Sequence, residues 1–243
     1  MAEWYVMTTP EFLSLASGAG IRNYVFLGEE EIPVPDRQEQ IRLAFQLVKK
    51  GFVSIEQKDD EKEEYVLKED LKELMQIVGD AERVLTVRYR GSSAPVYCVY
   101  GSGSRYACME TMASSDVSVR FGGGSEEEIL ERILLPEELP IELFEALPEM
   151  EEAVRRGVYT AVPGKTGKLP ADGSVYAVWE MLQAKSGKAA TRIIIRREKA
   201  EMHLIRETIL AEDAEQVKIS REIYLYSEKQ LHSQLKKLME EWE

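Results

Sequence analysis

The sequence predicts an α+β fold of two similar halves, residues 1–124 and 125–243, which form one compact domain and share a sheet. The sheet is expected to be central, mostly antiparallel and flanked by helices. Three observations predict this quasi-two-fold duplication. A helix–glycine–strand joint occurs at 45–53 (FQLVKKGFV) and again at 151–159 (EEAVRRGVY). A block of strand-like segments follows each joint. A helix that opens on an S-x-x-[E/Q] capping box follows each block, at Ser125 and at Ser227.

The first half contains segments with clear helical or strand patterns. Thr9 and Pro10 mark a helix start after a short strand at 3–7, because proline at the first helical position loses no hydrogen bond. Residues 38–51 form a helix with apolar positions Ile41, Ala44, Phe45 and Val48, and it ends at Gly51. A hairpin over 52–67 turns at KDDE, a helix covers 67–79, and strands cover 83–89, 94–100, 105–111 and 116–121. The glycines of GGGS at 122–125 are interpreted as a flexible joint.

The second half is expected to repeat this order. Residues 140–157 predict a helix, and 158–162 and 168–172 a hairpin around the turn PGKTG. The next segment, 174–187, is predicted to be helical. Strands are expected at 191–198, 201–210 and 215–226, and a last helix from Ser227. In this alignment Val84 and Ile193 lead corresponding sheet segments, and the capping serines Ser125 and Ser227 correspond.

Composition excludes several classes of function. The chain has a net charge of -13, spread evenly over both halves, which disfavours nucleic acid because binding to phosphates needs basic residues. The first residues lack the basic start and apolar core of a signal peptide, and no run reaches the about 20 apolar residues that span a bilayer. A cytoplasmic protein without membrane insertion is therefore expected.

Cys98 and Cys108 lie on two strand-like runs joined by the turn SGS. If Gly101 and Arg105 close that turn, the two cysteines lie directly opposite one another. A disulfide is then possible, but two reduced, buried cysteines are the favoured interpretation in a cytoplasmic protein. A metal would need further ligands, and neither histidine is near in sequence.

No motif predicts a catalytic, cofactor-binding or metal-binding residue, and the partner-binding residues remain unknown at this level. VPGKTGK lacks the first glycine of a phosphate-binding loop, because that position is Tyr159. His203 falls in a strand-like run and His232 on the polar side of the last helix, and neither has an acidic partner at a telling distance. Tyrosines of the predicted strands are open to two interpretations, core packing or a protein-binding sheet face.

Residues 10–67 follow the helix-then-hairpin order of a winged helix. In a DNA-binding winged helix the recognition helix and the wing carry basic residues, whereas this wing turns through KDDE and KEE. We therefore expect a winged-helix-like unit adapted to protein contacts.

Three segments resemble the EspG-like family associated with type VII (ESX) secretion: TPEFLSLASGAGIRN, IRLAFQLVKKGFVSIEQ and LKEDLKELMQIVGDAERVLTVRY. They cover roughly the first 90 residues. The resemblance implies a quasi-two-fold fold and a non-enzymatic cytoplasmic chaperone or adaptor without a cofactor, which binds small helical secretion substrates. Two alternatives remain: a winged-helix-derived transcription regulator, and an enzyme with an unrecognised site.

Overall fold

A computed structural model describes residues 4–21, 36–59, 62–89, 96–112, 118–134, 157–161, 175–183, 189–198, 201–212 and 217–240. In chain order the first series of elements is β1 (Tyr5–Thr8), α1 (Thr9–Gly18), α2 (Arg37–Lys49), β2 (Val53–Asp59), β3 (Lys62–Leu67), α3 (Glu69–Asp80), β4 (Arg83–Tyr89), β5 (Val96–Ser102), β6 (Arg105–Met112), β7 (Ser118–Gly124) and α4 (Glu126–Ile133). The second is β8 (Gly157–Ala161), β9 (Val175–Gln183), β10 (Ala189–Glu198), β11 (Glu201–Glu212), β12 (Val217–Leu225) and α5 (Glu228–Glu240).

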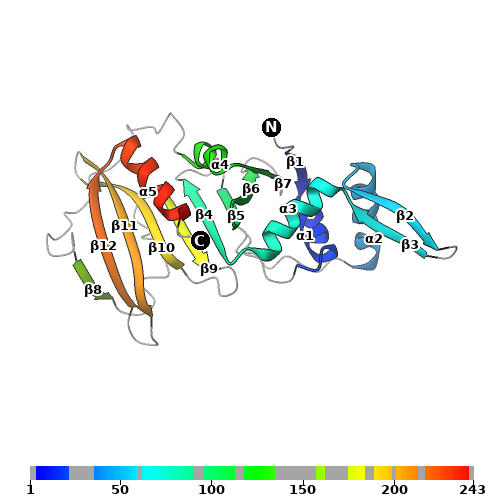
Figure 1. Ribbon diagram of the computed structural model, residues 1–243, viewed down its shortest axis with the longest axis horizontal. Helices are drawn as coiled ribbons and strands as arrows, with labels where there is room; N and C mark the ends of the chain where they lie inside the picture. The colour runs from blue at the N-terminus through cyan, green and yellow to red at the C-terminus, as the bar shows by residue number, and fades with distance from the viewer. Residues whose placement is uncertain are drawn as a thin grey trace.

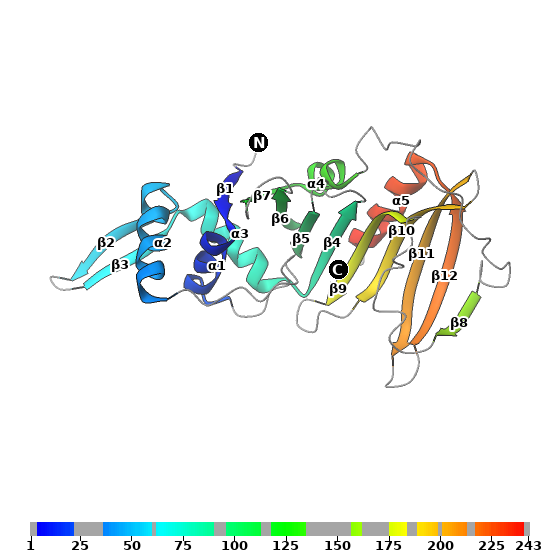
Figure 2. The ribbon, with the colours of Figure 1, turned by 180° about the vertical axis from the view of Figure 1, so that it is seen from behind.

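The α+β fold and the mostly antiparallel sheet are confirmed. The large sheet has ten strands in the order β1-β7-β6-β5-β4-β9-β10-β11-β12-β8, and every neighbouring pair is antiparallel. Read outward from the β4–β9 pair, both sides give four consecutive strands and then the first strand of their own series. The order of the large sheet is thus pseudo-symmetric about the β4–β9 pair (Figures 1 and 2). The expected match between the strands that begin near Gly51 and Gly157 is wrong, however: β8 pairs with β12 and takes the place of β1, whereas β2 pairs with β3 in a separate two-stranded sheet.

Each face of the large sheet packs on a different set of helices. On one face, α1 and α3 cover the β1–β5 side, with Phe12, Leu71 and Met75 fully buried. On the other face, α4 packs on β6 and β7 and α5 packs on β10 and β11, and Trp179 of β9 is the largest fully buried side chain. The two core clusters are therefore separated by the sheet itself, and α4 follows β7 as α5 follows β12.

One row of directly paired residues crosses the whole sheet on the face of α1 and α3. Thr86 stands at its centre. On the first side the row continues through Cys98, Met109, Phe121 and Tyr5, all buried. On the second side it continues through Glu180, Arg192, Glu207 and Arg221. We call these four residues the charged row.

The prediction of a helix over residues 174–187 is wrong, because the described part of this segment is strand β9. Ala177, Val178, Trp179, Met181 and Leu182 are all buried, because β9 lies near the middle of the sheet with packed side chains on both faces. A strand buried on both faces loses the period-two alternation that identifies strands. The counterpart of β4 is therefore β9, so the alignment of Val84 with Ile193 of β10 is wrong as well.

The predicted pairing of the cysteines is also wrong. The turn between β5 and β6 is closed by Ser102 and Arg105, with Gly103 at φ 58°, so Cys98 pairs with Met109 and Cys108 with Val99. A shift of one residue moves a side chain to the opposite face. Cys98 and Cys108 accordingly lie in different core clusters, free and buried, and cannot form a disulfide with each other in this fold.

Two local interpretations need smaller corrections. The cap of α1 is Thr8 rather than Thr9, and its helix begins one residue earlier than expected. Gly122 and Gly123 are not a flexible joint but buried positions of strand β7. A Cβ on Gly122 would lie 2.6 Å from the indole of Trp4, and one on Gly123 would lie 2.7 Å from Leu74. These glycines thus permit close packing against both faces of β7.

Several expectations fall outside the described residues, among them most of the predicted helix 140–157 and the turn PGKTG. Within the described part of the chain, no helix is both long and apolar enough to cross a membrane.

Candidate protein-binding surface

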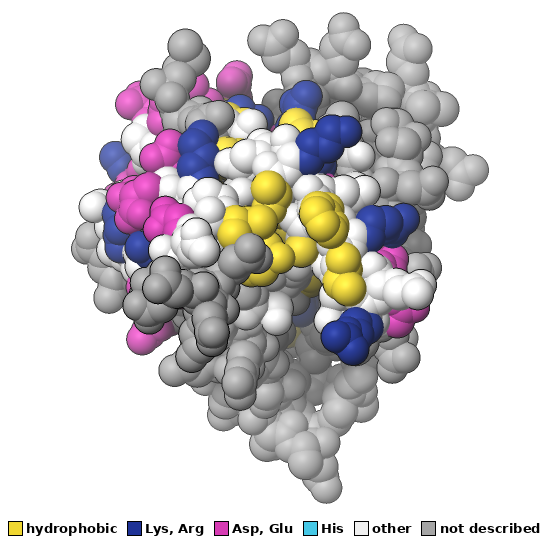
Figure 3. Space-filling model, turned by 90° about the vertical axis from the view of Figure 1, so that its right-hand side faces the viewer, with side chains coloured by type: hydrophobic (Ala, Val, Ile, Leu, Met, Phe, Trp, Pro, Cys, Tyr) yellow, Lys and Arg dark blue, Asp and Glu magenta, His cyan; other side chains and the backbone are white. Residues whose placement is uncertain are grey.

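Apolar side chains are exposed at the end of the molecule that carries α2 and the β2–β3 hairpin. Phe45 is 70% exposed and Ile41 51% on α2, while Tyr65 is 58% and Ile55 46% exposed on the hairpin. We call these four residues the α2–hairpin surface. Figure 3 views the molecule from this end and shows apolar side chains gathered near the centre of the view. Exposed apolar groups in such a cluster are typical of an interaction site.

Helical spacing explains why α2 exposes one apolar pair while burying another. Ile41 and Phe45 lie four residues apart and share one face, whereas Leu43 and Leu47 share a different face and are buried. Of the expected apolar positions, Ile41 and Phe45 are directed outward, whereas Ala44 and Val48 are half-buried and Val48 packs against the core. The helix therefore has enough apolar residues for a core contact and for a second, external contact.

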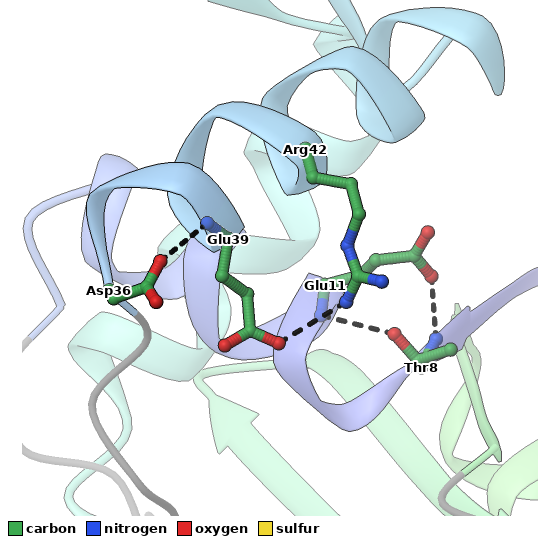
Figure 4. Close-up of polar contacts among 5 residues, drawn as sticks. All are labelled: Thr8, Glu11, Asp36, Glu39 and Arg42. Atoms are coloured by element: carbon green, nitrogen blue, oxygen red, sulfur yellow. Dashed lines mark hydrogen bonds and ion pairs between the residues drawn. The ribbon is translucent and has the colours of Figure 1, made fainter.

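Polar contacts at the helix starts fix α1 and α2 (Figure 4). Asp36 caps α2, since its carboxylate accepts the N–H of Glu39 at 2.9 Å, and Arg42 pairs with Glu39 at 3.2 Å. At the start of α1, Thr8 and Glu11 form a reciprocal capping box.

The end of α2 is tied to α1 through the same buried carboxylate. Lys50 Nζ lies 2.6 Å from Glu11 Oε2, and its ammonium lies 5.7 Å from the ring centroid of Phe52. Gly51 follows with φ 70°, a conformation that glycine adopts without strain. The lysine–glycine joint at 49–51 therefore has a structural role: Lys50 ties the end of α2 to α1, and Gly51 turns the chain into the hairpin.

Along one face of the hairpin, the side chains become more exposed with distance from its base. Val53 pairs with Leu67 at its base, and Val53 is buried. Ile55 pairs directly with Tyr65 two residues further out, so this cross-strand apolar pair is presented away from the core. A small cavity of about 170 Å³ lies between α1, α2 and the hairpin and is lined by Ala44, Leu47, Val53, Tyr65, Leu67 and three residues of α1.

A larger groove of about 740 Å³ lies beside the same hairpin. It runs between the end of α1, strand β3 and α3, and its lining includes Tyr65, Met75 and Gly79. Tyr65, Leu67 and Gly18 line both the groove and the small cavity. The α2–hairpin surface is therefore bordered by hollows that an apolar side chain of a partner could enter.

The histidines and cysteines considered in the sequence analysis can now be located in the fold. His203 is buried in β11, and His232 is exposed on α5, as expected. Burial raises the pKa of the Cys98 thiol to about 12 and raises the pKa of Cys108 further. Both cysteines are therefore protonated and unreactive near neutral pH. No three His, Cys, Asp or Glu residues of the described ranges are grouped so that they could hold a metal ion.

The tyrosines of the predicted strands were open to two interpretations, core packing or a protein-binding sheet face. Tyr97, Tyr100 and Tyr106 are buried in the core, while Tyr224 and Tyr226 are half-buried beside α5. Burial is also the main cause that raises the pKa of Tyr97 to about 12, with Glu110 as the next contribution. The exposed Tyr65 was not singled out from the sequence, although its pairing with Ile55 in a short polar hairpin was a usable signal.

Comparison with known proteins does not extend these findings. No protein-family model matches the chain, and no curated protein matches it.

Proposed function

We propose that this protein is a non-enzymatic cytoplasmic chaperone or adaptor that binds small helical secretion substrates of a type VII-like system. The observation that supports it is the α2–hairpin surface, four exposed apolar side chains on two adjacent elements. Covering apolar residues of this kind releases water and favours association. The charge and the buried, unreactive cysteines are compatible with a binding role.

The nature of the client follows from the shape of the surface. Ile41 and Phe45 form a ridge along one turn of α2, and Ile55 and Tyr65 form a second apolar pair on the hairpin. A client helix could lay an apolar strip across such a surface, with anchors at i, i+3 and i+4. The resemblance to EspG-like proteins supports the same client class, helical hairpins whose apolar tips are covered until export.

Co-purification from the native host tests this proposal. An affinity-tagged chain, isolated at moderate salt, should recover a small helical protein in near-stoichiometric amount, identified by mass spectrometry. Repeated recovery of the chain without any such partner, under conditions in which the tagged chain is folded by circular dichroism, would count against a chaperone role.

One observation favours a winged-helix transcription regulator as the second candidate. Helix α2 directly precedes the hairpin, and four basic residues, Arg37, Arg42, Lys49 and Lys50, lie along it. In a DNA complex such a helix would enter the major groove. The test is a mobility shift with DNA from the chain's own promoter region. Binding that weakens steeply with salt supports a regulator, and no shift even at about 50 mM salt removes it.

A further inference from the structure

The outer edge of strand β3 has no neighbouring strand among the residues that the structure describes. In that part of the chain β3 pairs with β2 alone, in a sheet of two strands. The edge of a sheet presents a row of backbone N–H and C=O groups, and such a row can pair with a further strand. The hydrogen bonds of the hairpin show which residues of β3 supply these groups.

Tyr65 and Leu67 direct their backbone groups toward the outer edge. In an antiparallel pair, residues whose N–H and C=O groups face the partner strand alternate with residues whose groups face away. At the base of the hairpin the N–H of Lys68 donates to the carbonyl of Phe52 at 3.0 Å, so Lys68 faces the other strand. The carbonyl of Val66 also faces that strand, because it accepts a serine hydroxyl of β2 at 3.4 Å. Tyr65 and Leu67 alternate with these two residues and therefore face outward.

The groove of about 740 Å³ follows this edge of β3. Its lining includes four consecutive residues of the strand, 64–67. Successive side chains of a strand point to opposite faces, so a hollow lined by all four lies along the edge. The opposite wall, at the ends of α1 and α3, includes the small exposed residues Gly18, Ala19, Gly20 and Gly79. Residues of this size leave room for another main chain to approach closely.

The charges of the groove favour a basic occupant. Glu64 and Asp80 contribute two exposed carboxylates to its lining. Among the described lining residues Lys72 contributes the one ammonium group, and its Nζ lies 3.5 Å from a carboxylate oxygen of Glu69. The lining is therefore net negative, in a chain whose net charge is -13. Complementary charge attracts a basic segment and disfavours an acidic one.

We propose that the groove holds an extended, basic segment of a partner protein, which adds to β3 as the third strand of the hairpin sheet. The outward backbone groups of Tyr65 and Leu67 bind the main chain of this segment, as in other cases of strand addition. Ile21 and Met75, which also line the groove, contact its alternate apolar side chains. This binding mode goes beyond the proposed function, because a client helix would lie on the α2–hairpin surface and the added strand lies at the edge of β3.

A short peptide of alternating valine and lysine, labelled with fluorescein, is the probe for this strand. Its binding to the full chain is measured by fluorescence anisotropy. Gln76→Trp places a large side chain in the groove from an exposed position on α3, and should weaken binding by about tenfold or more. Ser233→Trp is the matched control, a similar change at an exposed position on α5, and should bind as wild type does.

A second pair of variants isolates the contribution of the main chain. Tyr65→Ala removes the side chain and keeps the outward N–H. Tyr65→Pro also removes that N–H, and it leaves the hydrogen bonds to β2 in place because proline is tolerated where the N–H faces away from the partner strand. Tyr65→Pro should therefore bind the probe about fivefold more weakly than Tyr65→Ala, provided that circular dichroism shows both chains to be folded.

Several results would overturn the added strand. They are a wild-type chain that does not bind the probe, equal binding by Gln76→Trp and wild type, and equal binding by Tyr65→Pro and Tyr65→Ala. A wild-type dimer that Gln76→Trp converts to a monomer in sedimentation velocity would assign the edge to a second copy, and would also overturn it. A chain that fails with the probe but recovers a helical client would end this proposal and leave the proposed function standing.

Discussion

The two halves of the cross-strand row have the same backbone arrangement but different chemistry. Cys98, Met109 and Phe121 of the first half are fully buried and pack under α1 and α3. Their counterparts across the centre, Arg192, Glu207 and Arg221, are charged and form ion pairs between neighbouring strands. Duplication of the strand order therefore sets where side chains point, and leaves their chemistry free to diverge.

The charged row keeps its charges balanced although it is largely buried. Arg192 pairs with Glu180, and Arg221 Nε donates to Glu207 Oε1 at 2.8 Å. The side chains of Arg192 and Glu207 are only 6% and 7% exposed. Burying charges is costly unless they are paired, so the row depends on each partner in a way that the apolar half does not.

The largest effect is expected from the apolar half. Phe12 is fully buried and makes an edge-to-face contact with Phe121, the ring centroids 5.2 Å apart. Phe12→Ala should lower the free energy of unfolding by about 3–5 kcal/mol, through lost burial and the cavity left behind. Chemical denaturation measures the loss. The matched control is the exposed Phe45→Ala, expected within about 0.5 kcal/mol of wild type; equal losses in both would contradict the assigned burial.

In the charged half, loss of one partner should cost more than replacement of the pair. Glu207→Met leaves the mostly buried Arg221 without this carboxylate, and should destabilise by about 3 kcal/mol. Glu207→Met combined with Arg221→Met replaces the pair by apolar groups and should recover most of that loss. A double-mutant cycle by chemical denaturation checks this prediction. Additive losses would show that the two residues do not interact.

Alkaline pH should lower the stability of the folded protein, because the buried thiols resist ionisation. Cys98 has a folded-state pKa of about 12 against an ordinary value of 9.0, because burial disfavours the thiolate. Above the unfolded pKa, the unfolded chain loses this proton while the folded chain keeps it. Stability is therefore fully present below about pH 9 and should fall toward pH 12, by about 1.4 kcal/mol per pH unit for one such group.

Unfolding curves recorded from pH 8 to 11 measure this dependence. Cys98→Ala, compared with wild type at each pH, should show a shallower decline even though its stability at pH 8 is lower. An unchanged slope would mean that Cys98 does not titrate in this range on unfolding.

The smallest effect on stability is expected from the caps of helices α4 and α5. Ser125 caps α4 in a full capping box, in which Glu128 accepts the Ser125 N–H at 2.9 Å. At α5 the Ser227 hydroxyl accepts the N–H of Gln230 at 3.2 Å. Ser125→Ala and Ser227→Ala should each cost about 1 kcal/mol, with the larger loss at Ser125 because its box also holds a carboxylate. Thermal melting at neutral pH compares them, and a larger loss at Ser227 would contradict this ranking.

Local signals predicted most of the first half. The amphipathic pattern before Gly79 predicted α3, and the serine at 125 predicted α4. The segment KDDE predicted a hairpin, whose outermost described pair is Asp59 with Lys62. Each depends on a few neighbouring residues.

What could not be predicted depends on distant contacts. The strand state of Ala177–Leu182 follows from burial between β4 and β10, and the separation of Cys98 from Cys108 follows from a turn that is one residue tighter. The exposure of Phe45 required knowing that Leu43 and Leu47 supply the core contact of α2. The proposed binding surface could therefore not be identified from the sequence, because exposed and buried apolar residues of α2 follow the same local pattern.

The most direct test of the account compares the two exposed ends of the molecule in a co-purification from the native host. Ile41→Asp/Phe45→Asp alters the α2–hairpin surface, and Leu225→Asp alters a comparably exposed residue on β12, 67% accessible. Quantitative mass spectrometry should find the helical partner with wild type and with Leu225→Asp, and at least tenfold less of it with Ile41→Asp/Phe45→Asp. Equal recovery with all three folded proteins would contradict the assignment of this surface as the binding site.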